Sequence, residues 1–161
     1  MARNDCQAQP TRSELRSWLP DEDMALDAEC FESLAGFRSS LRRFLAASEV
    51  ISRSAGVTPQ QYQAMLAIKT RPGATMAMKE LAEQLLLTHH AAVQMMDRLS
   101  KAGLATREAS TADRRLVLLT LTTKGEELLD RLAEQHIDVI LRQEPALSAS
   151  LRNLRKSCKP K

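Results

Sequence analysis

A chain of 161 residues with 43% hydrophobic and 27% charged side chains has room for one domain with a real core, and its composition is ordinary for a soluble protein. No stretch approaches the roughly 18 apolar residues of a membrane span, and the N-terminus lacks the apolar segment of a secretory signal. Three widely spaced cysteines form neither a disulfide framework nor a CxxC metal pattern. A cytoplasmic protein without membrane contact is therefore expected.

The net charge of +3 is distributed unevenly along the chain. Residues 1–35 carry three basic against eight acidic side chains, residues 36–115 carry twelve against six, and residues 116–161 carry eight against six. The basic surplus therefore lies in the middle segment. It would suit a nucleic-acid surface there, although a surplus of this size is also typical of a solvated face.

The N-terminal part divides into a polar arm and a helix. Residues 1–20 are polar and are expected to form a loose arm. From Phe31 onward apolar side chains recur at helical spacing, and Gly56 ends the pattern. The apolar positions of this stripe are 31, 34, 37, 41, 44, 45 and 51.

Two short helices are predicted next. Thr58 can cap the first, Pro59 occupies its first helical position, and Gly73 follows its end. A short extended piece at residues 74–77 leads into MKELAEQLLL, which predicts a compact helix beginning at Met78 with one apolar face.

A third helix follows after only about two residues. Thr88 can cap it, Met96 and Leu99 are expected to face inward together with Val93, and Gly103 is expected to end it in a left-handed conformation. The side chains left outside are His89, His90, Gln94, Asp97, Arg98 and Lys101. Two helices joined by a tight turn, the second polar at its N-terminal end, are typical of a helix-turn-helix, whose second helix enters the DNA major groove.

Two extended segments, 104–109 and 116–121, are predicted to form a β-hairpin packed against these helices, called a wing. The residues between them end in Asp113, Arg114 and Arg115. Because the apolar run that follows needs burial, the charged triplet is expected at the tip of the wing. Arginine there would meet the negative potential of a minor groove, and Asp113 is expected to hold Arg115 in place.

The C-terminal region is predicted to contain a long helix and a short last one. Thr122 or Thr123 can cap the long helix, and Pro145 is expected to break it before LSASLRNLRK. His136 is expected at a surface or an interface rather than as a metal ligand. The apolar face of the long helix consists of Leu128, Leu129, Leu132, Ile137, Ile140 and Leu141. An apolar face of this width is typical of a dimer interface, which is the preferred interpretation, although it could also pack against the core of the same chain.

Two short patterns occur in order and at specific intervals. The first, at the end of the helix that Thr88 is predicted to cap, is Asp97-Arg98-Leu99, Lys101 and Gly103-Leu104. The second, on the wing, is Asp113, Arg115, Leu121-Thr122 and Gly125. With these patterns, the chain from about Leu34 to Leu132 resembles the MarR family of winged-helix transcriptional regulators.

The resemblance implies a mainly α fold with a small β-hairpin wing (α+β), which is a winged helix-turn-helix with N- and C-terminal dimerisation helices. The parts would be a loose arm (1–20), an N-terminal dimerisation helix region (21–57), the DNA-binding lobe (58–121), and C-terminal dimerisation helices with a basic tail (122–161). It also implies a homodimer that binds double-stranded DNA at an inverted-repeat operator, acts as a repressor, and is modulated by a small molecule such as an aromatic acid. The position of the effector site is left unknown.

The residues expected to contact DNA lie on the recognition helix and at the wing tip. They are Thr88, His89, His90, Ala91, Gln94 and Arg98 on the helix, and Asp113, Arg114 and Arg115 on the wing. Many family members have a basic residue where this chain has Gln94, so specificity here is expected to rest on hydrogen bonds, such as those between glutamine and adenine. Adjacent histidines point about 100° apart on a helix, which makes a poor metal pair, and neither a metal nor another cofactor is expected.

Other functions stay open. A winged helix can serve as a protein- or RNA-docking module. Some relatives sense peroxides through a cysteine in the first helix, so Cys30 raises the possibility of a cysteine-based redox-sensing regulator. Its acidic neighbours do not favour a reactive thiolate, and Cys158 is expected in a tail, which leaves a small interface residue as the simpler interpretation. The sequence has neither a nucleophile–base arrangement nor a phosphate-binding glycine loop, so an enzyme is not predicted.

Overall fold

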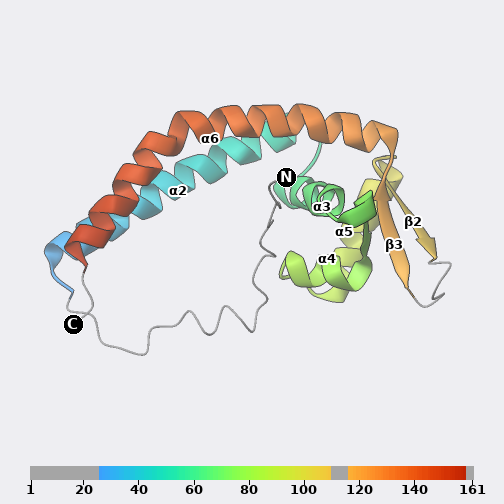
Figure 1. Ribbon diagram of the computed structural model, residues 1–161, viewed down its shortest axis with the longest axis horizontal. Coiled ribbons are helices and arrows are strands. Elements are labelled where there is room, and N and C mark those ends of the chain that lie inside the picture. Colours follow the sequence, from blue (N-terminus) through green and yellow to red (C-terminus); the bar gives the residue numbers. More distant parts are fainter. Residues whose placement is uncertain (1–25, 110–115, 159–161) are drawn as a thin grey trace, which may run out of the picture. The chain divides into compact units, whose positions relative to one another are not determined.

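The computed structural model describes residues 26–109 and 116–158, and Figure 1 shows how they are arranged. The elements in chain order are α2 (Ala28–Ser54), α3 (Pro59–Lys69), the 3₁₀ turn η1 (Pro72–Ala74), β1 (Thr75–Ala77), α4 (Met78–Gln84), α5 (His89–Lys101), β2 (Ala105–Ala109), β3 (Val117–Leu121) and α6 (Thr123–Ser157). The predicted fold class, mainly helical with a small sheet, is confirmed. The described chain divides into two compact units. Gln60–Leu129 form the first, and the segments up to Pro59 and from Asp130 onward form the second.

The first unit contains a three-stranded antiparallel sheet in the order β1-β3-β2. The hairpin of β2 and β3 is confirmed, and Arg107 pairs with Leu119 in its register. The sequence predicted an extended piece before α4, but its pairing with β3, through Met76 and Leu119, makes a third strand that was not expected. The largest fully buried side chains of this unit are Met65, Ile68, Met76, Leu81, Met96, Leu99, Leu119 and Leu129.

The turn between α4 and α5 is closed by backbone hydrogen bonds. Leu86 has a φ of 55°, its N–H donates to the Glu83 carbonyl at 3.1 Å, and the Leu87 N–H donates to the Ala82 carbonyl at 2.8 Å. This is the closure that glycine usually makes, and leucine adopts it at a cost of roughly 1–2 kcal/mol. The tight turn holds the beginning of α5 at a set distance from the end of α4.

Both predicted ends of α5 are confirmed. The Thr88 hydroxyl accepts a hydrogen bond from the Ala91 N–H at 3.2 Å. At the other end Gly103 has a φ of 69°, and its N–H and that of Leu104 donate to the Ser100 and Leu99 carbonyls, both at 2.9 Å. These caps satisfy backbone groups that the helix leaves without an internal partner.

In the second unit α2 and α6 run antiparallel along each other. Near one end Ser33 and Ser157 hydroxyls lie 3.1 Å apart, and towards the other the Ser48 hydroxyl lies 2.9 Å from His136 Nε2. Figure 1 shows α2 following α6 over this length. Asp27 caps α2 by accepting from the Cys30 N–H at 2.8 Å.

One prediction for the C-terminal region is wrong, and of the two places expected for His136, a surface or an interface, the surface is excluded. Pro145 does not break the chain into two helices, because α6 continues through it as one helix. Proline removes one backbone hydrogen bond and bends a helix, and packing along a partner can stabilise the helix on both sides. His136 is not at a surface: it is 4% exposed. Its Nδ1 donates to the Leu132 carbonyl at 2.7 Å.

Apolar side chains remain exposed on both helices of this unit. Within α2 only Cys30 and Ser52 are buried. The exposed large apolar residues on α2, on α6 and just before α2 are Leu26, Phe31, Leu34, Leu45, Val50, Ile137, Ile140, Leu141 and Leu151. None of the helices described is long and apolar enough to cross a membrane.

Candidate nucleic-acid interface

The α5 helix has one polar exposed side and one buried side. Ala92, Met95, Met96 and Leu99 form the buried side. The predicted contact residues Thr88, His89, His90, Gln94 and Arg98 are exposed and Ala91 is half-buried. Val93, which was expected inside, is half-buried. The helix therefore presents the polar side chains of its first two turns together, at the end where the helix dipole is positive.

Two of these polar side chains are hydrogen-bonded to each other. Gln94 Nε2 lies 2.9 Å from His90 Nε2, one helical turn away. The sequence predicted both residues on the exposed face but not this bond, although the spacing of four residues allows it.

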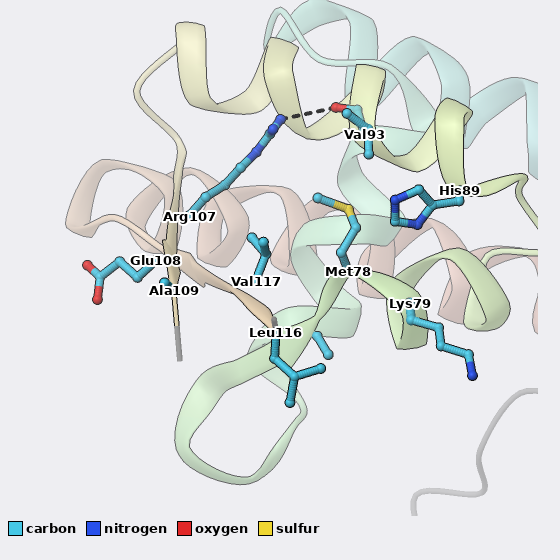
Figure 2. Close-up of a pocket in the computed structure, with 10 residues that line it drawn as sticks. Met78, Lys79, His89, Val93, Arg107, Glu108, Ala109, Leu116 and Val117 are labelled. Atoms are coloured by element: carbon cyan, nitrogen blue, oxygen red, sulfur yellow. Dashed lines mark hydrogen bonds between the residues drawn. The ribbon is translucent and has the colours of Figure 1, made fainter. Parts of the chain in front are cut away.

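Arg107 on β2 joins the wing to α5, a role that was not predicted from the sequence. Its Nη2 donates to the Val93 carbonyl at 3.0 Å and to Asp97 Oδ1 at 2.6 Å. Figure 2 shows the first of these bonds crossing from the strand to the helix. Asp97 had been expected only as an exposed residue of the family pattern. The signal that could have suggested the pair is an isolated arginine in a strand that packs beside a helix carrying aspartate.

A cavity of about 470 Å³ lies between the beginning of α5, the beginning of α4 and the wing strands (Figure 2). It is lined by Ala77, Met78, Lys79, His89, Val93, Arg107, Glu108, Ala109, Leu116 and Val117. The lining is largely apolar, with Lys79, His89 and Arg107 as basic groups. Arg107 Nε is buried and has no hydrogen-bond partner among the described residues. A small acid would find both apolar contact and a donor here.

The wing tip is not part of this geometry. Asp113, Arg114 and Arg115 lie outside the described residues, so their predicted roles remain predictions. The strands that lead to them are paired up to Ala109 and Val117.

Close contact between α6 and the end of α5 explains Gly125, another residue of the family pattern. A Cβ added at Gly125 would lie 2.0 Å from the carbonyl oxygen of Leu104. The Thr122 hydroxyl donates to the Gly103 carbonyl at 2.7 Å, and Lys124 Nζ donates to the Ala102 carbonyl at 2.9 Å. These contacts hold the first turn of α6 against the end of α5.

The second unit brings Cys158, which was expected in a tail, close to Cys30. Cys30 is buried, and its thiol donates to the Ser157 carbonyl at 3.1 Å. The hydrogen bond with Cys30 raises the pKa of the Cys158 thiol to about 11, and the nearby carboxylates of Asp27 and Glu29 add to the shift. Both cysteines line an apolar cavity of about 360 Å³. Within the described part of the chain, no group of three or more potential metal ligands occurs.

Comparison with known proteins agrees with this geometry. Residues 55–116 match the model of the MarR family. The chain is 28% identical over 114 residues, which are 71% of it and 65% of the relative, to a putative transcriptional regulatory protein for the hcr operon of Thauera aromatica. It is 33% identical over 88 residues, 55% of it and 56% of the relative, to the uncharacterized HTH-type transcriptional regulator YhbI of Bacillus subtilis. The chain thus spans less than two thirds of the length of these curated relatives.

A solved structure covers more of the fold. Sco3205, a MarR family transcriptional regulator from Streptomyces coelicolor solved in complex with DNA, superimposes with a TM-score of 0.66 at 25% identity and covers 74% of this chain and 78% of its own. Residues 55–116, the segment that matches the family model, contain α5, β2 and the contacts of Arg107 that join them. The winged-helix segment of the chain, residues 55–116, thus matches the MarR family of transcriptional regulators, and its fold is similar to that of a solved member of that family.

Proposed function

We propose that this chain is a homodimeric transcriptional regulator that binds specific double-stranded DNA sequences and represses nearby genes. The observation that carries the proposal is the exposed polar side of α5, which is backed by a fully buried side and fastened to the wing by Arg107. A rigid helix with polar side chains in its first turns is what base readout in a major groove requires. The related Sco3205 was solved with DNA, which supports the same role here.

The polar residues of α5 differ in the part of DNA that each is suited to contact. Gln94 has a donor and an acceptor for a base edge, and Arg98 has a charge for a phosphate. Thr88, His89, His90 and Ala91 lie in the first turn, where the helix dipole favours the phosphate backbone.

Dimerisation is proposed through the exposed apolar surface of α2 and α6. Val50 and Leu141, for example, are 68% and 66% exposed. Apolar patches that are large and continuous usually mark an interface, and identical subunits usually meet about a two-fold axis. Two recognition helices related in this way would read half-sites about 10–10.5 bp apart in an inverted repeat.

We also propose that a small aromatic acid modulates DNA binding from the cavity between α5 and the wing. Its carboxylate would accept from the buried Nε of Arg107, while Met78 and Val93 contact the ring. A ligand there would press on the first turn of α5 and on the wing strands at once, so it would change how the two fit DNA together. Loss of operator binding when benzoate-like acids are added, and no such loss in Arg107→Lys, is the expected result.

At the wing tip, we propose that Arg115 enters the minor groove, that Asp113 orients it, and that Arg114 contacts a phosphate. Arg115→Ala is expected to weaken binding to the operator, most strongly where its flanks are rich in A·T pairs. Asp113→Ala is expected to weaken binding although it removes a negative charge. Tighter binding of Asp113→Ala in a gel-shift titration would contradict the orienting role.

The experiment that tests the main proposal is selection of bound duplexes from random DNA by the purified full chain, followed by light scattering of the complex. The expected result is an inverted repeat bound by two copies. A single half-site bound by one copy would contradict the dimer, and binding to RNA or protein without binding to duplex DNA would favour a docking module instead.

Redox regulation is a second candidate, favoured by the position of Cys158 beside Cys30. A hydroperoxide would oxidise one thiol to a sulfenic acid and leave as an alcohol, and the other thiol would displace water to form a disulfide. In a Cys6→Ser background, peptide mapping after treatment is expected to show this disulfide, and operator affinity is expected to change with it. Two results would exclude this regulation. The first is that both thiols remain unmodified after hydroperoxide treatment. The second is that operator affinity changes equally in Cys158→Ser.

A further inference from the structure

The hydrogen bond between Gln94 and His90 restricts how each side chain can be used. Both residues are exposed on the polar side of α5, and the two nitrogen atoms that meet, each an Nε2, are 2.9 Å apart. An amide nitrogen can only donate, so His90 Nε2 must accept. The imidazole that accepts at Nε2 is neutral and carries its proton on Nδ1.

With the ring in this tautomer, the same bond holds the Gln94 amide in one orientation. If the amide were rotated by half a turn, its oxygen would face the accepting nitrogen of His90, and a hydrogen bond would form again only after the ring proton moved from Nδ1 to Nε2. In the selected orientation one N–H of Gln94 is used by His90. The other N–H and the amide oxygen have no hydrogen bond with the rest of the described chain.

A free N–H beside a free amide oxygen is the arrangement that reads adenine. In the major groove adenine presents an acceptor, N7, beside a donor, the N6 amino group, whereas guanine presents two acceptors, N7 and O6. An amide whose orientation is held before binding also loses less side-chain entropy when it meets the base.

We propose that His90 is a positioning residue that holds the Gln94 amide in the orientation that prefers adenine over guanine at one base pair of each half-site. This inference rests on the proposed DNA-binding function and adds to it how specificity arises at that position. His90 acts through Gln94 and does not itself need to contact a base.

His89 provides a matched control on the same turn. It has the same ring and is also exposed, but it lines the cavity with Met78 and Val93 (Figure 2). A change at His89 therefore alters the polarity and size of the first turn as a change at His90 does, while the hydrogen bond to Gln94 remains.

The test measures the affinity of the full chain for its selected operator and for the operator in which the A·T pair read by Gln94 is replaced by G·C. That pair is identified as the one at which Gln94→Ala loses discrimination. His90→Phe, which keeps a ring without nitrogen, is expected to lower the adenine-over-guanine ratio about 3- to 10-fold, and a general loss of DNA affinity cancels from this ratio. His90→Gln, whose amide reaches roughly where Nε2 lies, is expected to restore most of the ratio.

Non-additivity distinguishes positioning from direct contact. The double variant His90→Phe with Gln94→Ala is expected to discriminate no less than Gln94→Ala alone, and His89→Phe is expected to keep the wild-type ratio. An unchanged ratio in His90→Phe, additive losses in the double variant, or an equal loss in His89→Phe would each overturn the proposal.

A measurement without DNA separates this inference from the proposed function. Long-range ¹H–¹⁵N correlation spectra of the free protein are expected to show the Nδ1–H form of His90, and Gln94→Ala is expected to remove this preference. Failure of the chain to bind any duplex would refute the proposed function even if the tautomer were as expected. The opposite tautomer would refute the inference even if DNA is bound.

Discussion

Gly125 shows how a single missing methyl group can position a whole helix. A Cβ at this position would lie 2.0 Å from the Leu104 carbonyl oxygen and 2.9 Å from its carbon, so the clash would be with backbone and not with a flexible side chain. Relief would require α6 to move away from the end of α5. The hydrogen bonds of Thr122 and Lys124 with that end would then be stretched.

Gly125→Ala is therefore expected to lower the free energy of unfolding by about 1–3 kcal/mol, as overpacked sites do. Urea unfolding followed by circular dichroism measures this. Gly36→Ala is the control, because its Cβ would meet no other described atom within 4 Å and alanine is the better helix former. Equal stability of the two variants would contradict the close approach of α6 to Leu104.

Cys158 gives a second prediction at the scale of one residue. Its pKa is raised to about 11, first by the hydrogen bond with Cys30, so only a small fraction is thiolate near neutral pH. Since the thiolate is the nucleophile, alkylation by iodoacetamide at about pH 8 is expected to be slower than for an ordinary thiol and to accelerate up to about pH 11. Replacing Cys30 by alanine removes the main cause of the shift, so Cys158 is expected to react faster in that variant. A rate that is the same with and without Cys30 would show that the two thiols are not bonded.

At the scale of elements, α5 and β2 depend on one side chain for their connection. Arg107→Ala removes the bonds to the Val93 carbonyl and to Asp97, and it leaves both acceptors to water. The expected cost is about 1–2 kcal/mol of stability, because the pair is only partly buried. Operator affinity is expected to fall further than stability alone explains, since the helix and the wing must fit two grooves at the same time.

A double-mutant cycle with Asp97→Asn checks this prediction. The asparagine keeps an acceptor but loses the charge, so its own effect is expected to be smaller, and the two effects are expected not to add. Additive effects on operator binding would mean that Arg107 and Asp97 act separately.

At the scale of the whole molecule, the exposed apolar side chains of α2 and α6 predict association. The pair Ile137→Glu with Leu141→Glu places two carboxylates on this surface, where both residues are more than half exposed. Burying unpaired carboxylates costs much more than leaving them in water, so the variant is expected to be a monomer by light scattering. It is expected to keep its helix content and to lose operator binding. The control is Leu66→Glu on α3, a comparably simple surface change outside both helices. Association that survives the double change would contradict this interface.

Features that depend on a few neighbouring residues were determined by the sequence itself. Thr88 and Gly103 cap α5 through bonds to residues three to five positions away, so this helix could be predicted with its ends. The apolar run at Val117–Leu121 and the helical spacing of Met96 and Leu99 are local patterns, and they predicted a strand and the buried side of α5. For the same reason the exposed residues of α5 were predicted together.

Contacts between distant residues were decided only by the tertiary structure. Cys30 and Ser157 are separated by 127 positions, and Arg107 and Asp97 belong to different elements. Local sequence patterns therefore cannot predict either contact. Pro145 shows the converse, because a local rule predicted a break where packing of α6 along α2 continues the helix. Periodicity determines which face of an element is buried. Which residues of another element it meets depends on how the chain returns, and that is settled by packing and by hydrogen bonds formed only in the folded state.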